Sequence, residues 1–379
     1  MKAPFIWFGG KSVIAKEVWL RLGADIQNYI EPFVGSAAVL LTRPGWCRGI
    51  DWTETINDAN GYVSNFWRAI HAKPEETAHY ADWPVNENDL HARHAWLVGQ
   101  HENMQAALEG DPDWCDPKIA GWWCWGLALW IGSKFCGGNG RWHSVDGKLI
   151  RVTNGDSGPD IWRIRPHLSD KGRRIIAAEW MGVSRRRPQL TSKGQGVCAR
   201  EAPELLQWFA ALSARFARVR VTCGDWSRVC TPAVMLAKWP HCAVFLDPPY
   251  GSAAGRDPEI YTFDSDQVSS DVHAWCLANG DNPRLRIALC GYDGEHDMPP
   301  CWTCLAWKAQ GGYSNQGQDP SRDNPHRERI WFSPHCVRQA ELFRSDALDP
   351  VLVPEGLVAP MAGGEDDAED EGPQDDQAN

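Results

Sequence analysis

The sequence predicts an α/β fold built on a mostly parallel sheet, and three segments carry this prediction. Residues 244–246 are apolar and read as the end of a buried parallel strand, which Pro248 and Pro249 stop because proline fixes φ and donates no ladder hydrogen bond. Residues 28–40 predict a short strand, a tight glycine turn and the start of a helix. Residues 55–60 predict a second strand that ends in an acid and leads into a helix. Such strand ends meet at one edge of the sheet, where open α/β folds bind their ligands.

Composition places the chain among globular proteins that act inside the cell. With 379 residues the chain is long enough for two to three domains, and 43% hydrophobic residues suffice for a real core. The apolar run at residues 3–8 is too short for a signal peptide. The uncharged run at residues 119–133 is too short for a membrane span and predicts a buried helix. The thirteen cysteines are therefore expected to be reduced thiols. Cys301 and Cys304 form a lone C-x-x-C, so we expect no metal site.

Charge is distributed unevenly along the chain. The net charge is −11, but nine acids and no Lys or Arg lie between residues 355 and 379, so the preceding body carries only −2. This acidic tail is expected to be disordered and solvated, with DNA mimicry as the less favoured alternative. Residues 163–200 hold ten Lys or Arg against two acids. Clustered positive charge of this kind suits DNA phosphates.

The segment Asp247-Pro248-Pro249-Tyr250 suggests chemistry on an amine conjugated to a ring. The N6 amine of adenine is a weak nucleophile because its lone pair is delocalised into the ring. Asp247 and the Pro248 carbonyl could accept hydrogen bonds from this amine and localise that pair, while Tyr250 could stack on the base. The alternative is a plain strand-ending turn, since Asp and Pro are common in turns. The choice depends on whether the chain also provides a site for a methyl donor.

Four motifs occur in the order expected for one family. They are W-F-G-G-K at residues 7–11, E-P-F-V-G at 31–35, N-D-x-N at 57–60 and D-P-P-Y at 247–250. Over about residues 3–335 the chain resembles the Dam-type DNA adenine-N6 methyltransferases of bacteria and their phages. The resemblance implies a class I methyltransferase fold, Rossmann-like with helices on both faces of a mostly parallel sheet. It also implies S-adenosylmethionine (SAM) as methyl donor and no metal.

The resemblance assigns roles residue by residue. Asp247, Pro248 and Tyr250 would be catalytic. Residues around the SAM site would be Trp7, Lys11, Glu31, Phe33, Gly35, Asp58, Asp225, Trp226 and Asp247. Asp58 would hold the ribose, although from the sequence it could equally cap the following helix. The chain departs from the family at Ala37, where a second glycine is common.

The domain prediction follows from the same pattern. Residues 1–70 and 206–345 would form a discontinuous catalytic domain, residues 71–205 an inserted, mainly helical target-recognition domain, and residues 346–379 the acidic tail. His91 and His94 share a helix face in the insertion and, without a third ligand nearby, are expected at the surface. DNA contacts are expected from a glycine-rich loop with Lys134, Asn139 and Arg141, and from Arg185, Arg186 and Arg187.

Together these features predict a site-specific DNA methyltransferase that transfers a methyl group from SAM to N6 of adenine in duplex DNA. It would work in the cytoplasm of a bacterial host, for example in restriction and modification, as a monomer or weak dimer. Cytosine-N4 or RNA amino methylation is an alternative, since the electronic problem is the same. An inactive DNA-binding or decoy protein on this fold is another.

Overall fold

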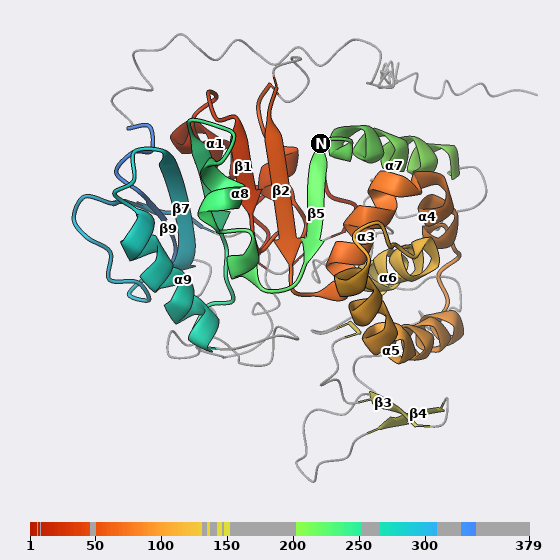
Figure 1. The fold of residues 1–379 in the computed structure, drawn as a ribbon. Helices are drawn as coiled ribbons and strands as arrows, with labels where there is room; N and C mark the ends of the chain where they lie inside the picture. The colour runs from red at the N-terminus through yellow and green to blue at the C-terminus, as the bar shows by residue number, and fades with distance from the viewer. Residues whose placement is uncertain are drawn as a thin grey trace, which may run out of the picture. The chain divides into compact units, whose positions relative to one another are not determined.

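A seven-stranded sheet forms the centre of the described structure (Figure 1). The computed structural model describes residues 1–5, 7, 9–45, 51–130, 135–136, 142–145, 148–151, 202–251, 266–308 and 327–338. The chain divides into a unit of residues 1–345 and a unit of residues 346–379. The second unit, which includes the acidic tail, lies outside the described residues.

The strand order of this sheet creates a switch point in its middle. The strands are β1 (Asn28–Glu31), β2 (Thr53–Asp58), β5 (Val219–Cys223), β6 (Cys242–Leu246), β7 (Leu285–Tyr292), β8 (Thr303–Ala306) and β9 (Glu328–Phe332), in the order β5-β2-β1-β6-β7-β9-β8. The first five in this order are parallel, and β9 runs antiparallel to both of its neighbours. The chain moves outward from β1 to β5 and then returns to β6 beside β1. Ligands in open α/β sheets bind at such a point.

Both faces of the sheet are covered by helices, as the sequence predicts. Along β6, Ala243 and Phe245 enter one hydrophobic cluster, whereas Val244 and Leu246 enter another. Alternate residues of a strand point to opposite faces, so each cluster marks one face. The first is shared with α1 (Ala15–Leu22), α2 (Ala38–Leu41), α3 (Gly61–Ala72) and α7 (Ala202–Phe216). The second is shared with α8 (Pro232–Leu236) and α9 (Asp266–Asn279) (Figure 1).

Three helices follow α3 and extend the first cluster. They are α4 (Pro74–Ala81), α5 (Glu87–Gly110) and α6 (Pro117–Leu129), and they pack against α3, α7 and one another. Asp116 begins α6 by accepting hydrogen bonds from the backbone of Lys118 and Ile119 at 2.8 and 2.9 Å. A hairpin of β3 (Trp142–Val145) and β4 (Lys148–Arg151) comes next. The expected buried helix within residues 119–133 is thus confirmed for α6, while the domain boundaries at 71 and 205 stay predictions. None of the described helices is long and apolar enough to cross a membrane.

The expectation that both histidines of α5 lie at the surface is wrong for His94. His91 is exposed, but His94 is buried, with its ring 4.6 Å from the ring of Trp130 and 5.2 Å from that of Phe135. Burial lowers the pKa of His94 to about 4, so it is neutral at physiological pH. The covering residues follow α6, and their contact with α5 depends on tertiary packing that helical spacing alone does not reveal.

Candidate active site

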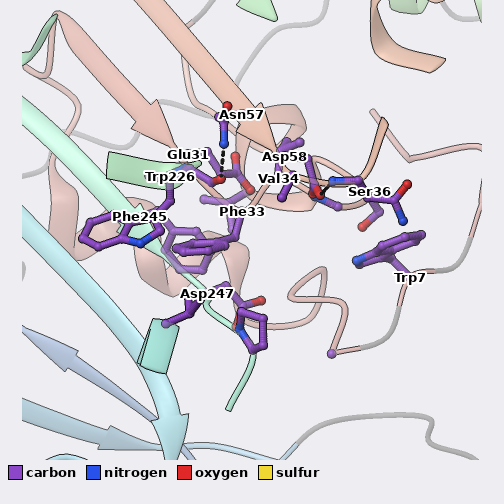
Figure 2. Close-up of a pocket in the computed structure, with 18 of the residues that line it drawn as sticks. Trp7, Glu31, Phe33, Val34, Ser36, Asn57, Asp58, Trp226, Phe245 and Asp247 are labelled. Atoms are coloured by element: carbon purple, nitrogen blue, oxygen red, sulfur yellow. Dashed lines mark hydrogen bonds between the residues drawn. The ribbon is translucent and has the colours of Figure 1, made fainter. Parts of the chain in front are cut away.

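A cavity of about 540 Å³ lies at the carboxyl edge of the sheet, a size typical of small-molecule sites (Figure 2). Its walls come from the N-terminal segment, from the turns after β1, β2, β5 and β6, and from α5 and α9. It lies where the strand order reverses, between β1 and β6. The lining includes Trp7, Lys11, Glu31, Phe33, Gly35, Asn57, Asp58, Gln105, Glu109, Asp225, Trp226, Phe245 and Asp247.

The turn after β1 requires glycine at position 35. Gly35 has a φ of +46°, and a Cβ atom there would lie 2.3 Å from Cδ1 of Trp7. The Gly35 amide donates to Asp58 Oδ2 at 3.0 Å, and its carbonyl accepts from Trp67 Nε1 at 2.9 Å. The turn is therefore fixed from both sides, and no side chain fits there.

Ala37 adopts the backbone conformation that explains why a second glycine is common at this position. Its φ and ψ are 54° and 29°, in the left-handed region, and its side chain is buried. The left-handed conformation costs an L-residue about 1–2 kcal/mol, which Ala37→Gly would relieve. The same substitution would lose about 0.8 kcal/mol from burial of the methyl group. It would lose about 0.4–1 kcal/mol more because glycine leaves the unfolded chain with greater conformational freedom.

We expect Ala37→Gly to change the free energy of unfolding by less than about 1 kcal/mol, because these opposing effects nearly cancel. Urea unfolding of the two proteins measures this difference. A loss of more than about 2 kcal/mol would show that the methyl group matters more than the backbone conformation.

Asp58 faces the cavity and does not cap α3. Its Oδ1 accepts from the Asn60 amide at 2.9 Å and its Oδ2 from the Gly35 amide. The cap of α3 is Asn60, whose Oδ1 accepts from the Tyr62 amide at 3.0 Å. Burial raises the pKa of Asp58 to about 6, although the two amides act against this shift. The helix-cap interpretation of Asp58 is therefore wrong, and its carboxylate lies at the end of β2, where ribose hydroxyls are held in related folds.

Two aromatic side chains flank the cavity near β5. The rings of Phe33 and Trp226 are 6.2 Å apart at an interplanar angle of 29° (Figure 2). Asn57 ties their two turns together, because its Nδ2 donates to the carbonyls of Pro32 and Gly224 at 3.1 and 2.8 Å. Neighbouring Asp225 also lines the cavity. A flat heterocycle could be held by this pair of rings.

Asp247 also lines the cavity and is paired with a buried lysine. Lys11 Nζ is 2.8 Å from Asp247 Oδ1 and donates to the Gly9 carbonyl at 2.7 Å. The side chain of Lys11 is only 3% exposed, against 20% for Asp247. Burial alone would lower the pKa of Lys11, but the carboxylates of Asp247 and Glu328 outweigh it and raise that pKa. Lys11 is thus a permanent cation against the predicted catalytic carboxylate.

Tyr250 contacts Asp247 and is not part of the cavity lining. Its hydroxyl is 2.8 Å from Glu328 Oε2 and 3.2 Å from Asp247 Oδ1, and its ring packs edge-on against Tyr292. Pro248 adjoins the cavity without lining it. Stacking of Tyr250 on a target base therefore stays a prediction. In the structure the hydroxyl of Tyr250 contacts the carboxylates of Glu328 and Asp247.

Glu31 is a second buried carboxyl group at the cavity. Its Oε2 accepts from the Tyr29 hydroxyl at 2.9 Å and from the Leu40 amide at 3.2 Å. Burial raises the pKa of Glu31 to about 8, and the charge of Asp247 acts in the same direction. Glu31 is therefore mostly protonated at neutral pH in the absence of a cationic ligand.

The structure adds residues that the sequence analysis missed. Gln105 and Glu109 of α5 line the cavity, and Gln105 Nε2 donates to Glu109 Oε1 at 2.8 Å and contacts Cys223 Sγ at 3.5 Å. Glu328 at the start of β9 contacts Tyr250. An acid at the start of a short strand was the only signal for Glu328, and nothing local marked Gln105.

Most predicted site residues converge on this cavity. All nine residues expected around the SAM site line it, whereas the predicted DNA contacts Lys134, Asn139, Arg141, Arg185, Arg186 and Arg187 lie outside the described residues. Within the described parts of the chain, no group of three or more His, Cys, Asp or Glu residues could hold a metal ion.

A comparison with known families supports the motif-based interpretation. Residues 7–96 match the family model described as D12 class N6 adenine-specific DNA methyltransferase. This segment contains the first three motifs and thus one side of the cavity, while Asp247 lies beyond it. No curated protein matches the chain. Residues 7–96, about a quarter of the chain, are thus similar to the D12 class N6 adenine-specific DNA methyltransferases.

Proposed function

We propose that this protein transfers the methyl group of SAM to N6 of adenine at a specific sequence in duplex DNA. One observation carries the proposal: Asp247 of the D-P-P-Y motif lines the same cavity as Glu31, Gly35 and Asp58. Strands 28–31, 53–58 and 242–246 bring these residues to one edge of the sheet. A donor in this cavity and an amine at Asp247 would be next to each other.

The residues present fit SAM. Asp58 offers carboxylate oxygens for the ribose hydroxyls, and Phe33 and Trp226 can hold the adenine ring. Glu31 and Asp247 provide carboxyl groups at the end that would face the cationic methionine part. When bound, SAM supplies an electrophilic methyl group on a positively charged sulfur.

The chain's own contribution is to bind, orient and exclude water. The contacts of Lys11 and Tyr250 both go to Asp247 Oδ1, and among the described residues Oδ2 has no hydrogen-bond partner. We assign Oδ2 and the Pro248 carbonyl to the two protons of the target N6. Extrusion of the adenine from the duplex costs a few kcal/mol, which contacts with the base offset. Orientation of the amine then provides most of the rate enhancement.

We expect SAM to bind about tenfold more tightly at pH 8 than at pH 6.5, because binding of a cation beside Glu31 favours its ionised form. In the protein without SAM, the raised pKa of Glu31 contributes to folding stability. This contribution is fully present below the pKa that Glu31 has in the unfolded chain, and it is lost as the pH rises through about 8. Calorimetric titrations at several pH values measure the affinity. The matched variant Glu31→Gln should lose most of this pH dependence, and a wild-type affinity that stays constant would contradict the assignment.

DNA binding should depend strongly on salt through the basic segment of residues 163–200. We propose that Arg185, Arg186 and Arg187 contact phosphates there. The triple alanine variant should lower the slope of log K against log salt by about three, since each phosphate contact contributes roughly one. Fluorescence anisotropy with duplex DNA over a salt series measures the slope. An unchanged slope would show that these arginines do not contact DNA phosphates.

The assay that tests the proposed function uses methyl-labelled SAM with duplex DNA and, separately, with RNA, followed by analysis of the nucleosides. We expect N6-methyladenine from duplex DNA. N4-methylcytosine or methylated RNA would show that the substrate is wrong, and DNA binding without any methylated product would indicate an inactive decoy. We place this activity in a bacterial cell, in restriction and modification of host or phage DNA, with the enzyme acting as a monomer or weak dimer.

A further inference from the structure

Three side chains form a continuous line of polar contacts that leads away from the cavity. Asp247 Oδ1 is 3.2 Å from the Tyr250 hydroxyl, which is 2.8 Å from Glu328 Oε2. The residues come from the end of β6 and from β9, two strands apart in the sheet. Only Asp247 lines the cavity, so Tyr250 and Glu328 form a path behind it.

The Tyr250 hydroxyl cannot donate a hydrogen bond to both of its carboxylate neighbours. A phenol has one proton, so it can donate to only one of the two carboxylates. The shorter contact is the one with Glu328, and Asp247 Oδ1 already accepts from Lys11 at 2.8 Å. The phenol therefore donates to Glu328 and turns an oxygen lone pair toward Asp247. A proton that arrives on Asp247 would then find an acceptor at once.

The proposed methyl transfer creates such a proton. An amine that has accepted a methyl group carries a positive charge until it loses a proton. We propose that Asp247, Tyr250 and Glu328 form a relay that moves this proton from N6 to Glu328. The relay rests on the proposed function, because it needs an amine that becomes charged beside Asp247.

The steps of the relay conserve atoms and charge. One N6–H bond breaks and an O–H bond forms on Asp247. The Asp247 carboxyl group then rotates about its Cβ–Cγ bond, which brings the protonated oxygen to Tyr250, and it gives its proton to the Tyr250 oxygen while Tyr250 passes its own to Glu328. N6 becomes neutral, Asp247 and Tyr250 regain their starting states, and Glu328 changes from carboxylate to acid. Lys11 keeps its charge throughout and stabilises Asp247 as a carboxylate between turnovers.

The surroundings of Glu328 suit a proton acceptor. The charged and titratable groups that face it are Lys11, Asp247, Tyr250, Glu295 and the thiol of Cys290. Burial raises the pKa of Glu328, Lys11 opposes the rise from 4.0 Å, and Asp247 and Glu295 add to it. The side chain keeps 6% exposure, which leaves a way for the proton to return to water.

The relay is tested by single-turnover methyl transfer measured over about pH 5 to 8. In the wild type the rate should rise with pH as Glu328 ionises, since an ionised carboxylate is the acceptor. Glu328→Gln should be about 10² slower at neutral pH and should lack this rise within the same range. Tyr250→Phe, which interrupts the relay by removing one hydroxyl, should show the same loss.

Two controls separate the relay from a structural role. Tyr62→Phe removes another buried hydroxyl, which donates to the Leu97 carbonyl at 2.7 Å, and it should keep the wild-type rate and pH profile. SAM affinity measured by calorimetry should be unchanged in Glu328→Gln, because Glu328 does not line the cavity. If Glu328→Gln fails to fold in a thermal unfolding test, Tyr250→Phe decides.

The outcomes distinguish the relay from the function on which it rests. If the wild-type protein forms no N6-methyladenine, both the proposed function and the relay are wrong. Active wild type with a Glu328→Gln variant that is slower at every pH, but keeps the rise, would show that Glu328 only supports Tyr250 and would overturn the relay. Wild-type rates in Glu328→Gln and Tyr250→Phe would overturn it as well.

Discussion

Asp247→Ala is expected to abolish methyl transfer, and Asp247→Asn to reduce it by about 10³-fold or more, while both bind SAM within a few fold of the wild type. The asparagine keeps the size of the side chain but replaces one carboxylate oxygen with an NH2 group, which donates and cannot accept, and the remaining amide oxygen carries no negative charge. Asp58, Phe33 and Trp226, to which we assign most of the donor contacts, line the cavity and are untouched by the change. Single-turnover rates and calorimetric affinities measure the two effects separately.

The stability of these variants needs its own control, because Asp247 is the partner of buried Lys11. Loss of the nearest partner of a buried lysine costs up to about 3–5 kcal/mol, which could mimic a catalytic defect by unfolding the protein, although Glu328 remains 4.0 Å from Lys11. The double variant Lys11→Met with Asp247→Asn removes the unpaired charge at similar volume. We expect it to recover stability in urea unfolding without recovering methyl transfer. Normal DNA methylation by any Asp247 variant would contradict the assignment of this residue.

Gly35→Ala is expected to weaken SAM binding by at least about tenfold and to destabilise the protein by roughly 2–5 kcal/mol. An alanine at a φ of +46° is strained, and its Cβ would lie 2.3 Å from the Trp7 ring, which has to move. Trp7 and the Gly35 link to Asp58 both belong to the cavity, so the donor site changes shape. Calorimetry with SAM and urea unfolding measure the two losses.

The matched control for Gly35 is Gly99→Ala in α5. A Cβ at Gly99 meets no atom within 4 Å, and the residue lies inside a helix, so the substitution should stabilise the protein by about 1 kcal/mol and leave SAM affinity unchanged. If Gly35→Ala bound SAM as tightly as Gly99→Ala, close packing of the turn against Trp7 would not shape the site.

The sequence was sufficient for the parts of the structure that local rules decide. The end of β6 could be predicted because two prolines follow an apolar run, and the positions of Glu31 and Asp58 could be predicted because each acid ends a short strand. Parallel strands then bring these ends to one edge without further information. For that reason the expected donor-site residues that follow these strands line one cavity, whereas Trp7 and Lys11 of the N-terminal segment were expected there from the resemblance alone.

The remaining features depend on distances between segments far apart in the chain. Lys11 was expected only to border the donor site, and its pairing with Asp247 joins segments more than 200 residues apart. Glu328 reaches Tyr250 across 78 residues, and Gln105 enters the cavity from α5. No periodicity or spacing marks such contacts. Asp58 shows the same limit at short range, because Asp58 and Asn60 are both good caps and only the structure shows that Asn60 is the one used.

The most direct test of the central claim is an experimental structure of the protein with S-adenosylhomocysteine, the product that remains after methyl transfer. The account predicts the product in the cavity, with its adenine between Phe33 and Trp226, its ribose hydroxyls at Asp58 and its sulfur facing Asp247. A product bound elsewhere, or bound here with Asp247 directed away from the sulfur, would contradict the claim that this strand edge unites the methyl donor with the residue that orients the amine.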